Sequence, residues 1–322
     1  MKIAPFLLLT ATITVQAVEP TPNLPPADAV ARVLRASPAV QAAAGQVRVE
    51  EANRERLAAG NYEWNVRLAA HQRKVLPSGA PDERFNEWNA QLERPFRLPG
   101  KAGKDEELGA LGVSLAEAGH GDALHEAGRA LLKAWFDWLR ENAAARQWQT
   151  QSELLSRQAH AVLRRQQLGD AARLESVQAE AALAQAQAQQ IQAEMRRTLA
   201  EEDLRRRFPG LPLQLPEKFA EPPRVQGDEA QWRERILAHS HEMGLARTAS
   251  LRAASAADRA GQERLPDPTL GVQMGRERGG EEQIVGAYLA INLPGAGRRA
   301  GASAALAEAE VAHRREAAVL QK

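Results

Sequence analysis

The stretch from Ala102 to Phe208 contains no proline, and Pro209 ends it. Alanine, leucine, glutamate, glutamine and arginine fill most of this stretch, a composition typical of long helices. The clearest break is Leu168-Gly169-Asp170, which predicts a short turn between two antiparallel helices over 102–208 with the turn at 168–170. The first of these helices would be roughly 100 Å long at 1.5 Å per residue. A helix of this length is longer than a small globular domain can accommodate. We therefore expect a long helical hairpin to be the main structural element of the chain.

The second of these helices carries small or apolar residues at alternating spacings of three and four. They are Leu174, Val177, Ala181, Ala184, Ala188, Ile191, Met195 and Thr198. Such a row lets another helix approach closely. It leaves two interpretations open: contact inside an ordinary helical hairpin, or contact with a helix of a larger coiled-coil assembly.

Composition excludes several classes of protein. The 322 residues contain no cysteine, which excludes disulfide scaffolds, thiolate zinc sites and cysteine nucleophiles. The net charge of +1 gives no support for a nucleic-acid partner. The histidines form no H-E-x-x-H pattern, and Gly100-Lys101-Ala102-Gly103-Lys104 lacks the spacing of a phosphate-binding loop. We therefore predict no catalytic residue, no metal site and no cofactor.

The N-terminus has the pattern of an export signal. Lys2 precedes an apolar run from Ile3 to Val15, and Val15-Gln16-Ala17 is a small-x-small cleavage site. We predict a signal peptide over 1–17, followed by an extended, proline-rich arm over 18–27. Helix is expected from about residue 28, with Ser37-Pro38 as a restart.

Two segments alternate with a period of two, which predicts β-strands. In the first, apolar residues at Trp64, Val66 and Leu68 alternate with polar ones, a turn-rich stretch follows, and alternation resumes up to Phe96. This predicts a β-hairpin over 62–98. The second segment predicts a hairpin over 266–293. There Leu270, Val272 and Met274 share one face, and Val285, Ala287, Leu289, Ile291 and Leu293 share another.

The second part of the chain repeats the first. Val66 and Leu68 correspond to Leu270 and Val272, and Leu98-Pro99-Gly100 corresponds to Leu293-Pro294-Gly295. The unit is helix, β-hairpin, Leu-Pro-Gly and long helix. We expect a first repeat over 28–208, a linker over 209–228 and a second repeat over 229–322. The second repeat is incomplete, because about 80 residues of the long helical hairpin have no counterpart.

These features together resemble the TolC-type outer membrane efflux proteins. The resemblance rests on the two-copy unit, on Pro266-Asp267-Pro268-Thr269-Leu270-Gly271, and on Leu293-Pro294-Gly295 followed by Arg298-Arg299. The stretch from Gln167 to Asp170 and from Leu174 to Glu180 resembles that family's helical tip. The segment from Arg276 to Glu282 is most similar to the heavy-metal branch of the family, of CzcC or CusC type.

The resemblance implies a mainly α fold with a β-barrel part. Long antiparallel coiled-coil helices would form a periplasmic tunnel, and two β-hairpins would give four strands to a 12-stranded barrel in a homotrimer. The implied function is a passive outer membrane duct that works with a periplasmic adaptor and an inner-membrane pump of the resistance-nodulation-division class, with heavy-metal cations as cargo.

The alternation then assigns two barrel faces. The residues expected to face outer membrane lipid are Trp64, Val66, Leu68, Trp88, Ala90, Leu92, Val285, Ala287, Leu289 and Ile291. Those expected to face the lumen are Asn65, Arg67, Glu87, Asn89, Gln91 and Glu93. By resemblance, the adaptor would contact the helical tip at Arg164, Arg165, Gln167, Leu168, Gly169, Asp170 and Arg173.

Three alternatives compete with the channel. An exported periplasmic coiled-coil scaffold would explain the helices but not the repeated alternating hairpins. A truncated remnant of a channel, unable to assemble, would explain the incomplete second repeat. A periplasmic enzyme is the weakest alternative, because no motif nominates an active site.

Overall fold

The computed structural model describes residues 23–76, 78–79, 81–216, 219–221 and 227–321. The expected signal peptide and the first part of the proline-rich arm lie outside these residues. The chain divides into two compact units. The first comprises residues up to 37 and 128–226, and the second comprises 38–127 and 227–322. Helix α3 (Lys101–Gln167) contributes to both.

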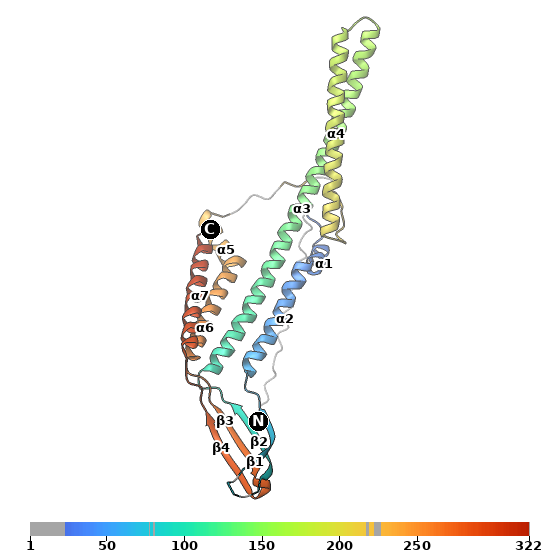
Figure 1. The fold of residues 1–322 in the computed structure, drawn as a ribbon. Coiled ribbons are helices and arrows are strands. Elements are labelled where there is room, and N and C mark those ends of the chain that lie inside the picture. The colour runs from blue at the N-terminus through green and yellow to red at the C-terminus, as the bar shows by residue number, and fades with distance from the viewer. Residues whose placement is uncertain (1–22, 77, 80, 217–218, 222–226, 322) are drawn as a thin grey trace, which may run out of the picture. The chain divides into compact units, whose positions relative to one another are not determined.

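The first unit is a helical hairpin closed at its base by a short helix. The second part of α3 runs antiparallel to α4 (Arg173–Arg207), and α1 (Ala27–Ala36) packs beside them (Figure 1). The core holds Ala29, Val33, Leu131, Ala134, Trp135, Trp138, Leu139, Leu204, Phe208 and Leu211. Trp135 also donates its Nε1–H to the carbonyl of Asn23 at 2.8 Å, so the segment before α1 is held against the hairpin.

Helix α4 packs on α3 through a different row of residues from the one that the sequence singled out. Its buried residues are Ser176, Ala186, Ala193 and Leu204, which lie 10, 7 and 11 positions apart and so share one side of the helix. In the predicted row, Leu174, Val177, Ile191 and Met195 are 66%, 52%, 67% and 59% exposed. The hairpin contact therefore does not use the predicted row, which leaves an apolar stripe on the outside of α4.

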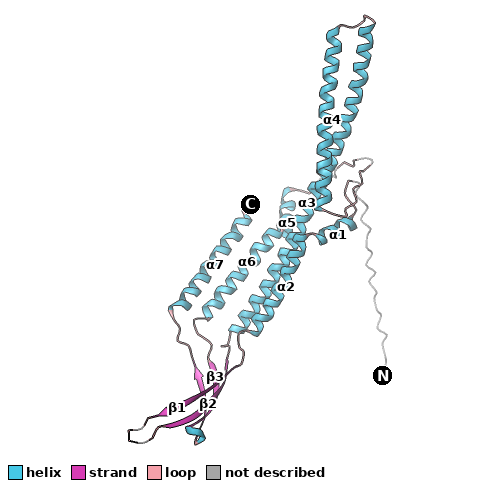
Figure 2. Ribbon diagram, turned by 45° about the vertical axis from the view of Figure 1, so that its right-hand side comes forward, coloured by secondary structure: helices cyan, strands magenta, loops and turns pink. Residues whose placement is uncertain are grey.

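The second unit combines helices with a sheet. Its helices are α2 (Pro38–Ala59), the first part of α3, α5 (Glu229–His239), α6 (His241–Gln262) and α7 (Ala296–Leu320). Figures 1 and 2 show α6 and α7 side by side. The repeat is visible in the helix starts: α2 begins at Pro38 directly after Ser37, and α6 begins after Ser240, whose side chain accepts from Met243 N at 3.2 Å. Both serines stand where an N-cap is favoured.

The two hairpins form one antiparallel sheet at the end of the second unit's helices (Figure 2). The strands are β1 (Asn65–Val75), β2 (Glu83–Pro95), β3 (Thr269–Glu277) and β4 (Glu282–Ala290), in the order β1-β2-β3-β4. A short 3-10 turn, η1 (Arg278–Gly280), joins β3 to β4. The joint between repeats is the β2–β3 pair. Across the described ranges, no helix is both long and apolar enough to cross a bilayer.

The mainly α fold with long antiparallel helices and two β-hairpins is thus confirmed. The four strands come from two hairpins that are about 170 residues apart in sequence, and a long-range joint of this kind costs loop-closure entropy that later contacts must offset. The contacts that hold this joint lie on the sheet faces and where the strands meet the helices.

Candidate functional site

One face of the sheet is apolar and exposed. The strand register places Leu68 opposite Ala90, Ala90 opposite Met274, and Met274 opposite Val285, so these four form one row across the sheet. A second row consists of Val66, Leu92, Val272 and Ala287. Leu68 and Val285 are each 74% exposed, and Val66 is 62% exposed. Such a contiguous apolar face in water marks an interaction with lipid or protein.

The ten residues predicted to face lipid all belong to this region. Val66, Leu68, Trp88, Ala90, Leu92, Val285, Ala287 and Leu289 lie on the apolar face, by their paired positions. Trp64 and Ile291 flank β1 and β4 at the helical end and are also exposed.

One prediction about this face was wrong. The rows of Leu270, Val272 and Met274 and of Val285, Ala287 and Leu289 were expected on different faces, but the register places them on the same one. Alternation within a strand shows which residues share a side of that strand, whereas the pairing of two strands decides which sides coincide. Leu270, Val272 and Met274 are therefore members of the apolar face that the residue assignment missed.

The opposite face is polar and internally hydrogen-bonded. It carries Asn65, Arg67, Glu87, Asn89, Gln91 and Glu93, the residues predicted to face the lumen. Asn65 Nδ2 donates to Glu93 Oε1 at 3.1 Å, and the Tyr288 hydroxyl donates to Glu93 Oε2 at 2.6 Å. The side chain of Glu87 is buried, 3.0 Å from His71 Nε2 and 3.1 Å from Arg73 Nε. The sheet thus has two chemically distinct faces.

A buried ion cluster joins the sheet to the helices where repeat one meets repeat two. Lys101 Nζ lies 2.9 Å from Asp267 Oδ1 and 2.7 Å from the carbonyl oxygen of Leu265. The same Asp267 carboxylate accepts from Leu98 N at 2.9 Å and from the Tyr62 hydroxyl at 2.7 Å. The Leu-Pro-Gly motif and the start of β3 therefore meet at one carboxylate.

The electrostatics of this cluster follow from its burial and its donors. Burial raises the pKa of Tyr62 to about 12, and the hydrogen bond to Asp267 acts in the same direction. Burial also acts to raise the pKa of Asp267, but hydrogen bonds from Lys101, the Leu98 amide and Tyr62 outweigh it and hold that pKa below its ordinary value. Asp267 is thus a charged carboxylate whose hydrogen bonds hold the structure together at this point.

The helical tip is a compact turn whose backbone is set by one glycine. Gly169 has a φ of +77°, and its N–H donates to Gln166 O at 3.0 Å. Asp170 N donates to Arg165 O at 2.9 Å, which completes a Schellman-type helix end. Arg165 also clamps Asp170, with Nε 3.1 Å from the carboxylate. The remaining predicted tip residues, Arg164, Gln167, Leu168 and Arg173, are all exposed there.

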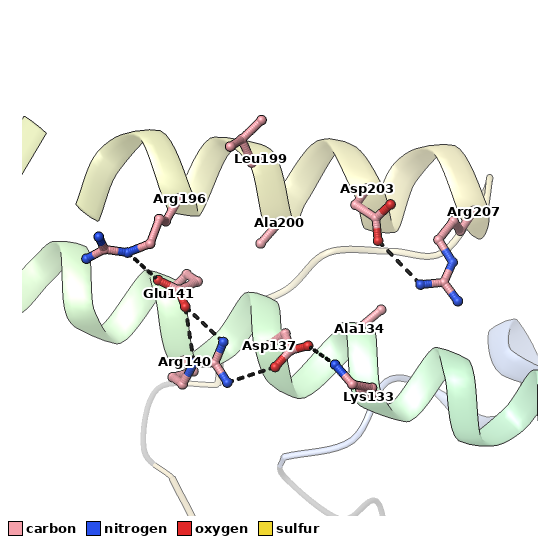
Figure 3. A pocket seen from close by; sticks show the side chains of 10 residues that line it. All are labelled: Lys133, Ala134, Asp137, Arg140, Glu141, Arg196, Leu199, Ala200, Asp203 and Arg207. Atoms are coloured by element: carbon pink, nitrogen blue, oxygen red, sulfur yellow. Dashed lines mark hydrogen bonds and ion pairs between the residues drawn. The ribbon is translucent and has the colours of Figure 1, made fainter. Parts of the chain in front are cut away.

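A charged groove between α3 and α4 lies in the first unit (Figure 3). Arg196 Nε lies 3.2 Å from Glu141 Oε2, so this pair crosses from α4 to α3. Arg140 pairs with Asp137 at 2.8 Å, and Arg207 pairs with Asp203 at 3.4 Å. Each carboxylate in this groove forms an ion pair with a neighbouring arginine or lysine. Such paired charges are typical of a surface where two helices pack together. Within the described ranges, no three histidine or acidic side chains gather as metal ligands.

Comparison with known proteins identifies the fold. No protein-family model matches the sequence, and no curated protein is significantly similar to it. The outer-membrane channel OprN matches with a TM-score of 0.74 at 17% identity, over 94% of this chain and 72% of OprN. The outer membrane protein VceC of Vibrio cholerae matches with a TM-score of 0.67 at 17% identity, over 91% of this chain and 74% of VceC. CusC matches with a TM-score of 0.68 at 12% identity, over 91% of this chain and 72% of CusC.

These structures are TolC-type outer membrane channels. The chain has this fold.

Proposed function

We propose that this chain is a subunit of an outer membrane efflux channel, a passive duct without chemistry of its own. The observation that carries the proposal is the four-stranded sheet with one exposed apolar face and one polar face. Membrane-spanning backbone must be fully hydrogen-bonded, which a sheet achieves only by closing into a barrel. Four strands are too few to close alone, so copies of the chain must complete the ring.

The dimensions support a barrel. The strands are 11, 13, 9 and 9 residues long, and a tilted transmembrane strand needs about 9–11 residues. The apolar face would contact lipid, and the polar face, with Arg67, Gln91 and Glu93, would line an aqueous lumen. Three copies would give the twelve strands that the resemblance implies.

The helical hairpin supports the second half of the proposal. The stripe of Leu174, Val177, Ile191 and Met195 on α4 is left largely exposed by the described residues and suits a neighbouring helix of a tunnel wall. The tip, with Leu168 80% exposed among Arg164, Arg165 and Arg173, is proposed to contact the periplasmic adaptor, which in turn connects to an inner-membrane pump of the resistance-nodulation-division class.

The cargo is proposed to be heavy-metal cations. Support comes from the resemblance of the segment from Arg276 to Glu282 to the heavy-metal branch, and CusC is among the structures with the same fold. Export by the N-terminal signal is part of the same proposal.

The test is expression of the full chain together with its adaptor and pump in a host that lacks its own channel. We expect heat-modifiable oligomers in the outer membrane and lower accumulation of the exported cation. Deletion of Gly169 and Asp170 should abolish the export and leave the oligomers in the membrane. A chain recovered only as soluble periplasmic protein would favour the coiled-coil scaffold instead.

A further inference from the structure

The apolar side of the sheet changes its chemistry toward the end that lies away from the helices. Beyond the row that contains Leu68, the register gives a row made of Ala70, Trp88, Arg276 and Gln283. The next pairs on this side are Gln72 with Asn86 and Lys74 with Arg84. This end of the apolar side is therefore polar and basic, and we call Lys74, Arg84 and Arg276 the basic rim.

Charges at this end of the strands are sorted by the side of the sheet. The basic rim lies on the apolar side, whereas the polar side carries, at the same end, the acidic residues Glu83, Glu87, Glu277 and Glu282. Arg73 is the cation that accompanies them, 3.1 Å from Glu87 and 2.8 Å from Glu277. Water on both sides would give no reason for such a separation. It is expected where the two sides contact different media.

Two cations of the basic rim are open to an external anion. Lys74 Nζ lies 2.7 Å from Asp82 Oδ2, so its charge is balanced within the chain. Arg84 and Arg276 are exposed and form no hydrogen bond or ion pair with any residue that the structure describes. They belong to β2 and β3, the two central strands, so they lie in the middle of the sheet and not at its edges.

The basic rim begins where the apolar band ends. Exposed apolar residues continue past β4 to Leu293, which follows Gln283 by ten residues. Ten residues at 3.4 Å each, with a tilt of roughly 40°, span about 26 Å, close to the apolar band of a membrane barrel. Trp88 is 41% exposed directly opposite Arg276, a position typical of an aromatic residue at a membrane interface.

We infer that Arg84 and Arg276 bind a phosphorylated lipid headgroup of the outer leaflet. In the proposed channel the helices lie on the periplasmic side, so the basic rim lies at the opposite membrane surface. Arginine suits this ligand, because its planar guanidinium donates two parallel hydrogen bonds to one phosphate. The acyl chains then cover the neighbouring rows of Leu68 and Val285. This inference rests on the proposed channel and adds a lipid site to it.

The spacing of the two arginines fits a headgroup that carries two phosphates. Arg276 lies opposite Trp88, and Arg84 lies four residues from Trp88 along β2. At 3.4 Å per residue and 4.8 Å between strands, the Cα atoms of the two arginines are about 14 Å apart. Side chains of a strand stand roughly perpendicular to the sheet, so each arginine holds its own phosphate. A lipid with two phosphates on one headgroup engages both.

The experiment measures the binding of bisphosphorylated lipid A to the detergent-purified oligomer of the full chain by native mass spectrometry. We expect R84Q/R276Q to bind this lipid at least about tenfold more weakly than the unmodified chain, because each basic residue near an anionic lipid adds to the attraction. R84K/R276K keeps both charges but loses the planar donor pair, and it should lose about two- to threefold.

The matched control is R67Q. Arg67 is an exposed arginine of the same sheet, but it lies on the polar side of β1. Its replacement removes the same charge and should leave lipid binding unchanged. An equal loss in R67Q and R84Q/R276Q would show that binding follows the net charge of the sheet, and it would overturn the site.

Three further ligands identify what the site recognises. Phosphatidylcholine, whose headgroup is zwitterionic, should not displace lipid A. Monophosphorylated lipid A should bind several-fold more weakly than the bisphosphorylated form, and equal binding would overturn the two-phosphate assignment. Millimolar inorganic phosphate should leave the lipid in place, because it does not cover the apolar rows. Displacement by inorganic phosphate would show a site for the free anion and overturn the lipid assignment.

The outcomes separate the lipid site from the function. Unchanged lipid A binding by R84Q/R276Q, with heat-modifiable oligomers still present, would overturn the lipid site and leave the channel standing. The single variants R84Q and R276Q should each lose part of the affinity, and they decide the question if the double variant does not assemble. An unmodified chain recovered only from the soluble periplasm would overturn the proposed function, and the lipid site with it.

Discussion

Lys101 and Asp267 form an ion pair of 2.9 Å between residues 166 positions apart, at the joint between the two repeats. Lys101 is 2% exposed and follows the Leu-Pro-Gly motif of the first repeat, whereas Asp267 precedes β3 of the second. Removing one partner of a buried pair leaves an uncompensated charge, so the pair makes the joint of the two hairpins sensitive to substitution.

The Lys101→Met variant should therefore unfold more easily. We expect a loss of about 3 kcal/mol in the free energy of unfolding, the lower end for breaking a buried pair. The matched control is Lys104→Met on the same helix, since Lys104 makes ion pairs to Glu107 and Asp258 but is only half-buried. Denaturant unfolding in detergent should show a clear shift for the first variant and little for the second, and equal shifts would contradict a special role for Lys101.

The lowered pKa of Asp267 predicts a pH dependence of stability. A carboxyl group with a depressed pKa in the folded state stabilises the fold at pH values above its unfolded pKa of about 3.9, and this contribution is lost as the pH falls through the lower folded pKa. The stability difference between the unmodified chain and Asp267→Asn should thus be largest near neutral pH and shrink below about pH 4. Thermal unfolding across that range measures it, and a difference independent of pH would argue against the assignment.

Glycines in α3 allow close helix contacts in the second unit. A Cβ atom at Gly109 would lie 3.0 Å from Arg54 Cα of α2, whereas one at Gly103 meets nothing within 4 Å. Alanine at an open helical position improves helix propensity by up to about 1 kcal/mol, but overpacking against backbone costs about 1–3 kcal/mol. Gly103→Ala should stabilise and Gly109→Ala should destabilise in the same unfolding assay. The two variants changing stability in the same direction would count against this packing.

The tip depends on the left-handed backbone of Gly169. An added Cβ would meet no atom within 4 Å, so the cost of Gly169→Ala is confined to its φ of +77° and amounts to about 1–2 kcal/mol. The amides of Gly169 and Asp170, both hydrogen-bonded to the end of α3, should exchange with solvent about 5–30-fold faster. Gly244→Ala, at an open position in α6, is the control and should leave tip exchange unchanged.

The two faces of β1 should respond differently to charge. Leu68 lies on the apolar face, and the adjacent Ala69 lies on the polar one opposite Asn89. An arginine on a lipid-facing barrel position costs about 2–4 kcal/mol near the bilayer midplane. Leu68→Arg should therefore strongly reduce the heat-modifiable oligomer in the outer membrane, whereas Ala69→Arg should be tolerated. Equal yields of the two variants would show that this face does not contact lipid.

Local patterns alone predicted much of this structure. The end of α3 at Gln167 and the start of α4 at Arg173 follow from the turn at Gly169, and the strands follow from alternation around Val66 and Leu270. These features depend on interactions within a few residues, where side-chain period and backbone preference act directly. The membership of Val66, Leu68 and Val285 in an apolar face was visible for the same reason.

The tertiary structure decided the relations between distant segments. Helix α4 carries two rows of suitable residues, and only its packing on α3 selected the row of Ala186 and Ala193 over that of Ile191 and Met195. The pairing of β3 with β4 placed Met274 and Val285 on one face, and the assembled fold brought Asp267 to Lys101. Periodicity fixes which residues of one element share a side, whereas register and partner choice depend on the free energy of the assembled fold, to which residues far apart in sequence contribute together.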